Sequence, residues 1–180
     1  MLPLNIRFKY LFEIIKIDFL MNFHKDDRIQ KDGNKIYHES ARGFVFYEDP
    51  KTHKLFVALI KPKGSCGLFI SKGHLKNNET PLEAANREIC EELSLMNKPV
   101  FVSNLAVDEY SFTLDDSGEE HFKKVHLFVF TLDTKDQLSP PVGESISDAV
   151  WVEFYEALKD MAYDKDNLLR ARQIYYLNKY

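Results

Sequence analysis

The stretch GHLKNNETPLEAANREICEELSL, residues 73–95, joins a polar loop that starts with glycine to a helix with an unusual charge pattern. Thr80 can cap this helix, Pro81 suits its first position, and Glu83 can complete a capping box. The sequence therefore predicts a helix from Thr80 to about Leu93. Its loop offers a glycine where the backbone can approach another group closely.

Two adjacent faces of this helix differ in polarity. At about 100° per residue, one arc of roughly 80° carries the apolar residues that we expect to be buried, Leu82, Ala85, Ile89 and Leu93. A neighbouring arc of about 100° carries Glu88, Glu91 and Glu92. Carboxylates at these spacings repel one another, and Arg87 offsets only part of that repulsion. A solvated acidic face is one interpretation, and a bound Mg²⁺, with Mn²⁺ as a substitute, is the other.

The fixed spacings of this stretch resemble a known family motif. Gly73, Glu79 and the run REICEELSL, residues 87–95, are similar to the Nudix box G-x5-E-x7-R-E-U-x-E-E-x-G-U, in which U is apolar. Every fixed position matches except the second glycine, which is Ser94. The flanking pattern extends the resemblance to residues 38–178. It implies an α/β/α sandwich with a mixed β-sheet, and an enzyme that hydrolyses a pyrophosphate linkage in a nucleoside diphosphate derivative.

The resemblance also implies roles for individual residues. Metal ligands would be Glu88, Glu91, Glu92 and the carbonyl of Gly73. Glu88, Glu91 and Arg87 would act in catalysis, and Arg87 would orient Glu88 and pair with Glu79. Relatives often use an acidic residue before a tryptophan corresponding to Trp151 as general base or extra ligand. Glu144 is our first choice for that role, its rivals being Glu119, Glu120 and Asp148, and an ordinary loop carboxylate is the alternative reading.

Two further segments resemble particular branches of the family and thereby indicate a substrate class. The start Lys72-Gly73-His74 is similar to the branch that cleaves diadenosine polyphosphates and diphosphoinositol polyphosphates. Lys123-Lys124-Val125-His126-Leu127-Phe128 resembles a K-x-V-x-Y-F strand of diadenosine tetraphosphate hydrolases, with Leu127 in place of the tyrosine. The predicted substrate-binding residues are Arg42, Lys72, His74, Lys76, Tyr110 and Lys123, each of which could instead be an ordinary surface or core residue.

We therefore expect hydrolysis of a dinucleoside polyphosphate such as diadenosine tetraphosphate. The alternatives are a diphosphoinositol polyphosphate, sugar-nucleotide or nucleoside triphosphate pyrophosphohydrolase, and a nucleotide sensor without catalysis. RNA decapping is disfavoured because no basic extension for RNA is visible. Ser94 should end the helix in a left-handed conformation, which costs a non-glycine residue on the order of 1 kcal/mol.

Composition narrows the class of protein. The chain has 180 residues, with 24 Lys and Arg against 28 Asp and Glu. This balance argues against a dedicated DNA-binding protein, so we expect no DNA partner. The partner that the Nudix resemblance implies is a small-molecule nucleotide or polyphosphate substrate. Cys66 and Cys90 fit no zinc spacing and indicate free thiols in a reducing, cytoplasmic compartment.

The chain divides into two regions by pattern. Residues 1–37 predict an amphipathic helix followed by a polar linker over residues 24–38, and residues 38–180 predict the Nudix domain. Charged residues interrupt the apolar stretch from Leu2 to Phe23, so it predicts no membrane span of the required ~20 residues. The helix could dock on the domain, pair with another chain in a homodimer or lie on a membrane surface, and Met21 could instead be the true start.

Overall fold

The computed structural model describes residues 26–113, 117–140, 145–161 and 163–179. The helix predicted within residues 1–37 lies outside the described residues, so it stays a prediction. In chain order the elements are β1 (Ile29–Asp32), β2 (Lys35–Glu48), β3 (Leu55–Pro62), β4 (Lys72–His74), α2 (Pro81–Leu93), β5 (Val100–Thr113), β6 (Glu120–Thr131), β7 (Ile146–Glu153), α3 (Phe154–Asp160) and α4 (Lys165–Lys179).

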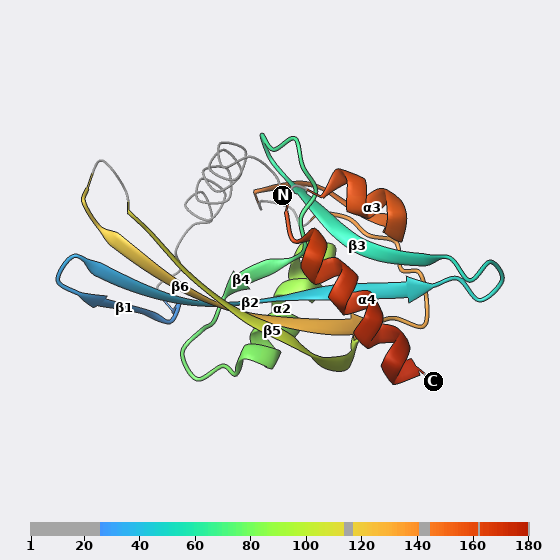
Figure 1. The fold of residues 1–180 in the computed structure, drawn as a ribbon, viewed down its shortest axis with the longest axis horizontal. Coiled ribbons are helices and arrows are strands. Elements are labelled where there is room, and N and C mark those ends of the chain that lie inside the picture. The colour runs from blue at the N-terminus through green and yellow to red at the C-terminus, as the bar shows by residue number, and fades with distance from the viewer. Residues whose placement is uncertain (1–25, 114–116, 141–144, 162, 180) are drawn as a thin grey trace.

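The strands form one mixed sheet around the long strand β2 (Figure 1). Its main path runs β5-β6-β2-β3-β7, and the short strands β1 and β4 both pair with β2. The pairing of β2 with β6 is parallel, whereas the other pairings between described strands are antiparallel. This architecture confirms the predicted mixed α/β fold.

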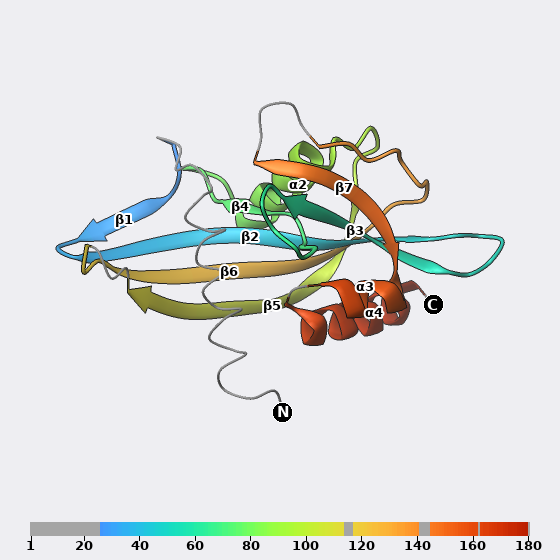
Figure 2. The same ribbon diagram turned by 90° about the horizontal axis from the view of Figure 1, so that it is seen from above.

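Helices cover both faces of the sheet, as Figure 2 shows, with α2 on one side and α3 and α4 on the other. Side chains alternate along β2, so Val45 packs in the core under α2 and Phe44 in the core under α3 and α4. A Cβ atom on Gly43 would lie 2.6 Å from the Phe130 ring and 2.8 Å from Ile89 Cδ1. Glycine at this position therefore lets α2 lie close against the sheet.

Three details of the sheet differ from the sequence-based expectation. The polar segment 24–38 is no linker, because β1 and the start of β2 form a hairpin within it, turned at Gly33 with φ 59°. The apolar runs at residues 100–106 and 109–114 predict two strands, and the structure has one continuous strand, β5, in their place. The short apolar run 68–70 predicts a strand, but it makes only single bridges, such as the one between Phe69 and Ile60. An exposed hairpin needs no apolar alternation, so residues 24–38 carried no strand signal.

Candidate functional site

The loop before α2 is fixed at both ends. Its Glu79 side chain accepts a hydrogen bond from the Lys76 backbone N–H at 2.9 Å. The Thr80 hydroxyl accepts from the Glu83 N–H at 3.3 Å, and the Glu83 carboxylate accepts from the Thr80 N–H at 2.9 Å. The predicted capping box is therefore confirmed, and α2 begins at Pro81.

Gly73 and Glu88 lie in direct contact. A Cβ atom built on Gly73 would lie 1.9 Å from Cδ and 2.0 Å from Oε1 of Glu88. Any larger residue in this place would displace the Glu88 carboxylate. Burial raises the pKa of Glu88, although the guanidinium of Arg87 opposes this effect. The fold thus brings together two of the groups that the motif predicts as ligands.

Arg87 connects the loop to the carboxylates of α2. Its Nε and Nη2 donate to the two carboxylate oxygens of Glu79 at 2.8 and 2.9 Å, and Nη2 also donates to the His74 carbonyl at 3.0 Å. Its Nη1 donates to Glu88 at 2.5 Å and to Glu91 at 3.1 Å. The predicted pairing of Arg87 with Glu79 and its contact with Glu88 are both present.

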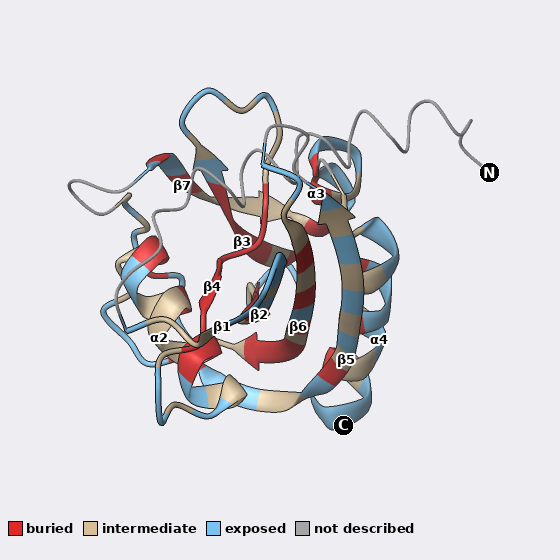
Figure 3. Ribbon diagram, turned by 90° about the vertical axis from the view of Figure 1, so that its left-hand side faces the viewer, coloured by how far each residue is buried: buried red, intermediate tan, exposed pale blue. Residues whose placement is uncertain are grey.

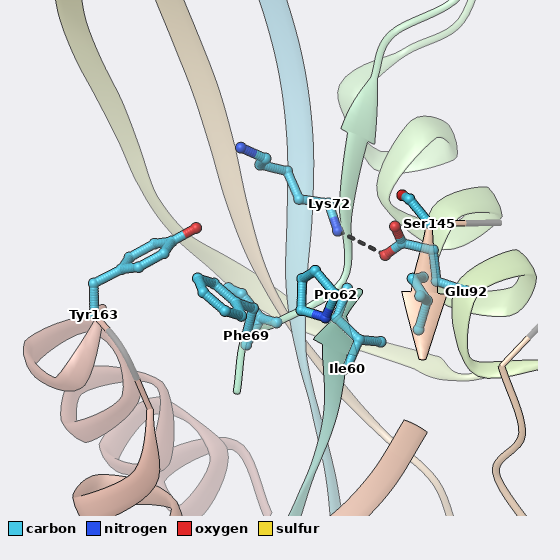
Figure 4. Close-up of a pocket in the computed structure, with 9 residues that line it drawn as sticks. Ile60, Pro62, Phe69, Lys72, Glu92, Ser145 and Tyr163 are labelled. Carbon is cyan, nitrogen blue, oxygen red and sulfur yellow. Dashed lines mark hydrogen bonds between the residues drawn. The ribbon is translucent and has the colours of Figure 1, made fainter. Parts of the chain in front are cut away.

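Glu92 is the buried carboxylate of the group. Only 4% of its surface is exposed, and burial together with nearby Glu88 raises its pKa to about 8. The backbone N–H of Lys72 donates to Glu92 Oε2 at 3.0 Å (Figure 4). Glu92, Lys72 and Tyr163 line the same pocket, together with Phe69 and Ser145. Glu92 therefore lies where α2, β4 and the segment before α4 meet.

These residues suit a divalent cation in their donor chemistry. The side-chain donors are carboxylate oxygens, which hard cations prefer, and the absence of a side chain at Gly73 leaves its backbone accessible to the same region. In the described part of the chain, however, no three His, Cys, Asp or Glu side chains surround a common point. Glu88 and Glu91 face Arg87, and Glu92 faces the Lys72 N–H. Their service as ligands stays a prediction.

Buried cations line the sheet face opposite α2. Arg42 on β2 lies beside Lys72 on β4, and His38, four residues before Arg42, lies beside Lys123 on β6. Burial, and to a smaller extent the charge of Lys123, holds the pKa of Lys72 well below its usual value. Burial and the charge of Arg42 likewise lower the pKa of Lys123 to about 7. The predicted cationic residues of three strands thus converge on one face, the cationic face (Arg42, Lys72 and Lys123).

Arg42 is already engaged with acidic groups on this face. Its Nη2 donates to Asp108 at 3.0 Å, and its Nη1 lies 2.6 Å from Asp164 Oδ2. The ion pair with Asp164 is almost completely buried on both sides. The structure thus gives Arg42 a role in holding α4 to the sheet, and its predicted binding of substrate stays untested.

The other predicted residues are spread around the cationic face. Tyr110 pairs across β5 and β6 with Lys123 and packs against the core, as its core interpretation expects, and its stacking with a base stays a prediction. His74 pairs with Ser40 on the same face, and Lys76 lies in the loop that Glu79 holds. Glu144 lies outside the described residues.

Two residues of this region carried no signal in the sequence. Tyr163 lines the pocket beside Glu92, and Asp164 forms the buried ion pair with Arg42. Asp164 adopts a left-handed backbone with φ 70° directly before α4. Figure 3 shows how β4 and β6 carry the buried residues between α2 and α4. Only the closure of α4 onto the sheet brings these two residues to the site.

Comparison with known families identifies the fold. The NUDIX domain family model matches residues 37–171. The chain belongs to this family. The prediction of a Nudix pyrophosphohydrolase is thereby confirmed at the level of the family, and Nudix hydrolases generally use divalent metals. No curated relative matches the chain.

Solved structures share the Nudix fold at low sequence identity. The Ap4A hydrolase binary complex of C. elegans is 18% identical, with a TM-score of 0.58 over 78% of this chain and 98% of that chain. The NUDIX domain of Shewanella oneidensis NrtR complexed with ADP ribose is 13% identical, with a TM-score of 0.59 over 88% of this chain and 97% of that chain. Identities this low show the fold and leave the substrate open.

The exclusion of DNA as a partner is wrong for a Nudix chain. NrtR of S. oneidensis complexed with a 27mer DNA is 14% identical, with a TM-score of 0.55 over 74% of this chain and 60% of that chain. A near balance of basic and acidic residues therefore does not exclude a DNA partner for a chain with this fold, and the comparison assigns no DNA binding to this chain. Among the helices of the described residues, none is long and apolar enough to span a membrane.

Proposed function

We propose that this chain is a metal-dependent hydrolase of pyrophosphate linkages that prefers dinucleoside polyphosphates such as diadenosine tetraphosphate. The observation that carries the proposal is the hydrogen bond between the Lys72 N–H and Glu92, which joins the carboxylates of α2 to the cationic face. An anionic group next to buried cations suits a substrate whose phosphates bind both a metal and ammonium groups.

Mg²⁺ is the proposed cofactor, with Mn²⁺ as a substitute. Glu88, Glu91, Glu92 and the Gly73 carbonyl would hold it. Bound there, the metal supplies Lewis-acid stabilisation of the charge at phosphorus and a water of lowered pKa. Arg87 would orient Glu88 and release Glu91, whose side chain is 56% exposed.

The phosphate chain would lie along the cationic face. Lys72 stands beside Arg42, and Lys123 stands beside His38, four residues away along β2. The charge of Lys123 acts on Lys72 and that of Arg42 acts on Lys123, so the three cations form one group. Several cations together favour a substrate with several phosphates. Tyr110, the neighbour of Lys123, offers an aromatic ring on which a distal base could stack.

Glu144 is proposed as the general base, because relatives often place an acidic residue in the loop before this tryptophan. Positioned proton transfer contributes about 10²–10⁴-fold to a rate. Glu144→Gln should therefore lower kcat far more than Glu119→Gln, since Glu119 forms an ion pair with Lys31 on the β1–β2 hairpin. Equal and small effects would return the role to a glutamate of the box.

A side-by-side hydrolysis screen with Mg²⁺ tests the proposal. It compares diadenosine tetraphosphate, ADP-ribose, a nucleoside triphosphate, a sugar nucleotide and a diphosphoinositol polyphosphate. We expect the highest kcat/KM for diadenosine tetraphosphate, with ATP and AMP as products of asymmetric cleavage. A tenfold preference for ADP-ribose or a triphosphate would overturn the substrate assignment. Tight nucleotide binding without turnover would point instead to a sensor.

A further inference from the structure

Arg28 lies close to the site although it precedes the part of the chain that the family model matches, residues 37–171. Its segment pairs with the loop that follows β4. The backbone N–H of Arg28 donates to the Leu75 carbonyl at 2.7 Å, and the Asn77 N–H donates to the Asp26 carbonyl at 3.0 Å. The stretch before β1 is therefore hydrogen-bonded along this loop through the backbone.

The Arg28 guanidinium joins the loop to the sheet. Its Nη2 donates to the Glu79 carbonyl at 2.6 Å and to the Lys76 carbonyl at 3.3 Å. Its Nη1 donates to Glu39 Oε2, on strand β2, at 3.1 Å. One planar group thus satisfies two loop carbonyls and holds them at a fixed distance from the central strand.

Glu39 is itself held by the neighbouring strand. His126 Nε2 on β6 donates to Glu39 Oε1 at 2.8 Å. Burial opposes ionisation, but the hydrogen bonds from His126 and Arg28 keep the pKa of Glu39 below its usual value. A charged Glu39 fixed between β2 and β6 gives Arg28 a rigid anchor.

The loop residue that Arg28 holds is also the one that binds Arg87. The Glu79 carbonyl accepts from Arg28, while the Glu79 carboxylate accepts from Arg87 at 2.8 and 2.9 Å. The preceding residue, Asn78, has a left-handed backbone with φ 67°, a conformation that needs support from its surroundings. A shift of the loop would therefore move Arg87 and, with it, Glu88.

We propose that Arg28, anchored by Glu39, is a positioning residue of the active site that sets the place of Glu79, Arg87 and the carboxylates of α2. This inference rests on the proposed function, because it assumes that these carboxylates bind a metal. Arg28 contacts none of the box side chains that would touch substrate or metal. Its effect should appear in metal affinity and kcat, with KM little changed.

The test compares Arg28→Gln and Arg28→Lys with the matched control Lys31→Gln, in the full chain. Lys31 lies three residues further along the chain, in β1, and forms an exposed ion pair with Glu119 at 2.7 Å, away from the loop. Three quantities are measured: Mn²⁺ binding to the substrate-free protein by electron paramagnetic resonance, kcat and KM for diadenosine tetraphosphate, and the melting temperature. Loss of groups that orient metal ligands commonly costs 10–100-fold in affinity or activity.

We expect Arg28→Gln to weaken Mn²⁺ binding and lower kcat by about tenfold or more, with KM within about threefold of the wild type. Arg28→Lys should show the same losses of Mn²⁺ affinity and kcat, because one ammonium group cannot reach Glu39 and both carbonyls together. Lys31→Gln should match the wild type.

Arg28→Gln with wild-type Mn²⁺ affinity and kcat would overturn the inference, as would a lower melting temperature alone. If Arg28→Gln does not fold, Glu39→Gln decides, and it should shift both quantities in the same direction. A wild type that neither binds Mn²⁺ nor hydrolyses any substrate of the screen would instead refute the proposed function.

Discussion

Arg87 and Arg42 are both guanidinium groups held by carboxylates, yet they are built into the molecule in opposite ways. The side-chain partners of Arg87 lie within eight residues of it in sequence, and its side chain is 20% exposed. The partners of Arg42, Asp108 and Asp164, are 66 and 122 residues away, and its side chain is 6% exposed.

Because of this difference, the hydrogen bonds of Arg87 can rearrange, whereas those of Arg42 cannot. Arg87 is bonded to Glu79, Glu88 and Glu91, so it can give up one carboxylate and keep the others. Arg42 and Asp164 form an ion pair away from water, so moving either one would leave the other charge buried and unpaired. We therefore expect substitutions around Arg87 to affect activity and substitutions around Arg42 to affect stability.

The largest effect should come from Glu92→Gln, on the α2 side of this comparison. A lost metal ligand should cost on the order of 10³-fold in kcat. The fold should remain, because glutamine still accepts the Lys72 N–H and removes a carboxyl whose pKa burial has already raised to about 8. Steady-state kinetics with Mg²⁺ and a thermal melt measure both. Glu156→Gln, on the exposed surface of α3, is the control, and full activity in EDTA would contradict the metal-dependent mechanism.

Arg42→Met should give the largest loss of stability. Removing one partner of a buried ion pair costs about 3–5 kcal/mol, since the other charge stays buried and unpaired. Urea unfolding measures this change, and Lys31→Met, which breaks an exposed pair, should stay within about 1 kcal/mol of the wild type. A stable Arg42→Met protein with a strongly raised KM would instead assign Arg42 to substrate binding.

Lys123→Met tests the cationic face through pH. Because burial and Arg42 lower the pKa of Lys123 to about 7, the residue loses its charge as the pH rises through that value. Glu92, whose pKa is raised to about 8, ionises over the same range in both proteins, so the quantity to compare is the ratio of their kcat/KM values for diadenosine tetraphosphate. At pH 6 the wild type should be about tenfold more active than the variant, which corresponds to one charge-assisted hydrogen bond. This ratio should fall towards one at pH 8, and a ratio that does not change with pH would remove Lys123 from the phosphate site.

The smallest effect concerns the end of α2. Ser94 adopts φ 50° and ψ 46°, the left-handed conformation that glycine tolerates better. Ser94→Gly should raise the free energy of unfolding by about 1 kcal/mol and leave kcat/KM unchanged. Urea unfolding and steady-state kinetics check the two statements. Ser94→Val, which is β-branched, should destabilise the protein, and equal stability of all three proteins would contradict the assignment of strain.

The sequence predicted the α2 region well because its contacts are local. The capping box, the left-handed end at Ser94 and the pairing of Arg87 with Glu79 all connect residues at most eight positions apart. Such spacings on a helix determine which side chains meet, with no knowledge of the rest of the fold. The burial of Glu92 was the exception, since it depends on where β4 and Tyr163 lie.

The cationic face could be predicted only in part. The motif resemblance selected Lys72 and Lys123, but their meeting depends on the register of both strands with β2. The partners of Arg42 could not be predicted, because Asp164 reaches the sheet only when α4 packs. Arg28 was assigned to a linker, since the hairpin that directly follows it begins with a short, polar and mostly exposed strand.

The parallel pairing of β2 with β6 has a consequence for how the chain folds during its synthesis on the ribosome. Phe46 and Thr131, paired in the two strands, lie 85 residues apart in sequence. At roughly 5–20 residues per second, β6 is synthesised several seconds after β2. Helix α2 can form during that interval from its own capping signals, while the side of β2 that awaits β6 stays open to other strands. Incomplete chains should therefore be inactive and prone to aggregate, and activity should appear only once β6 has been translated.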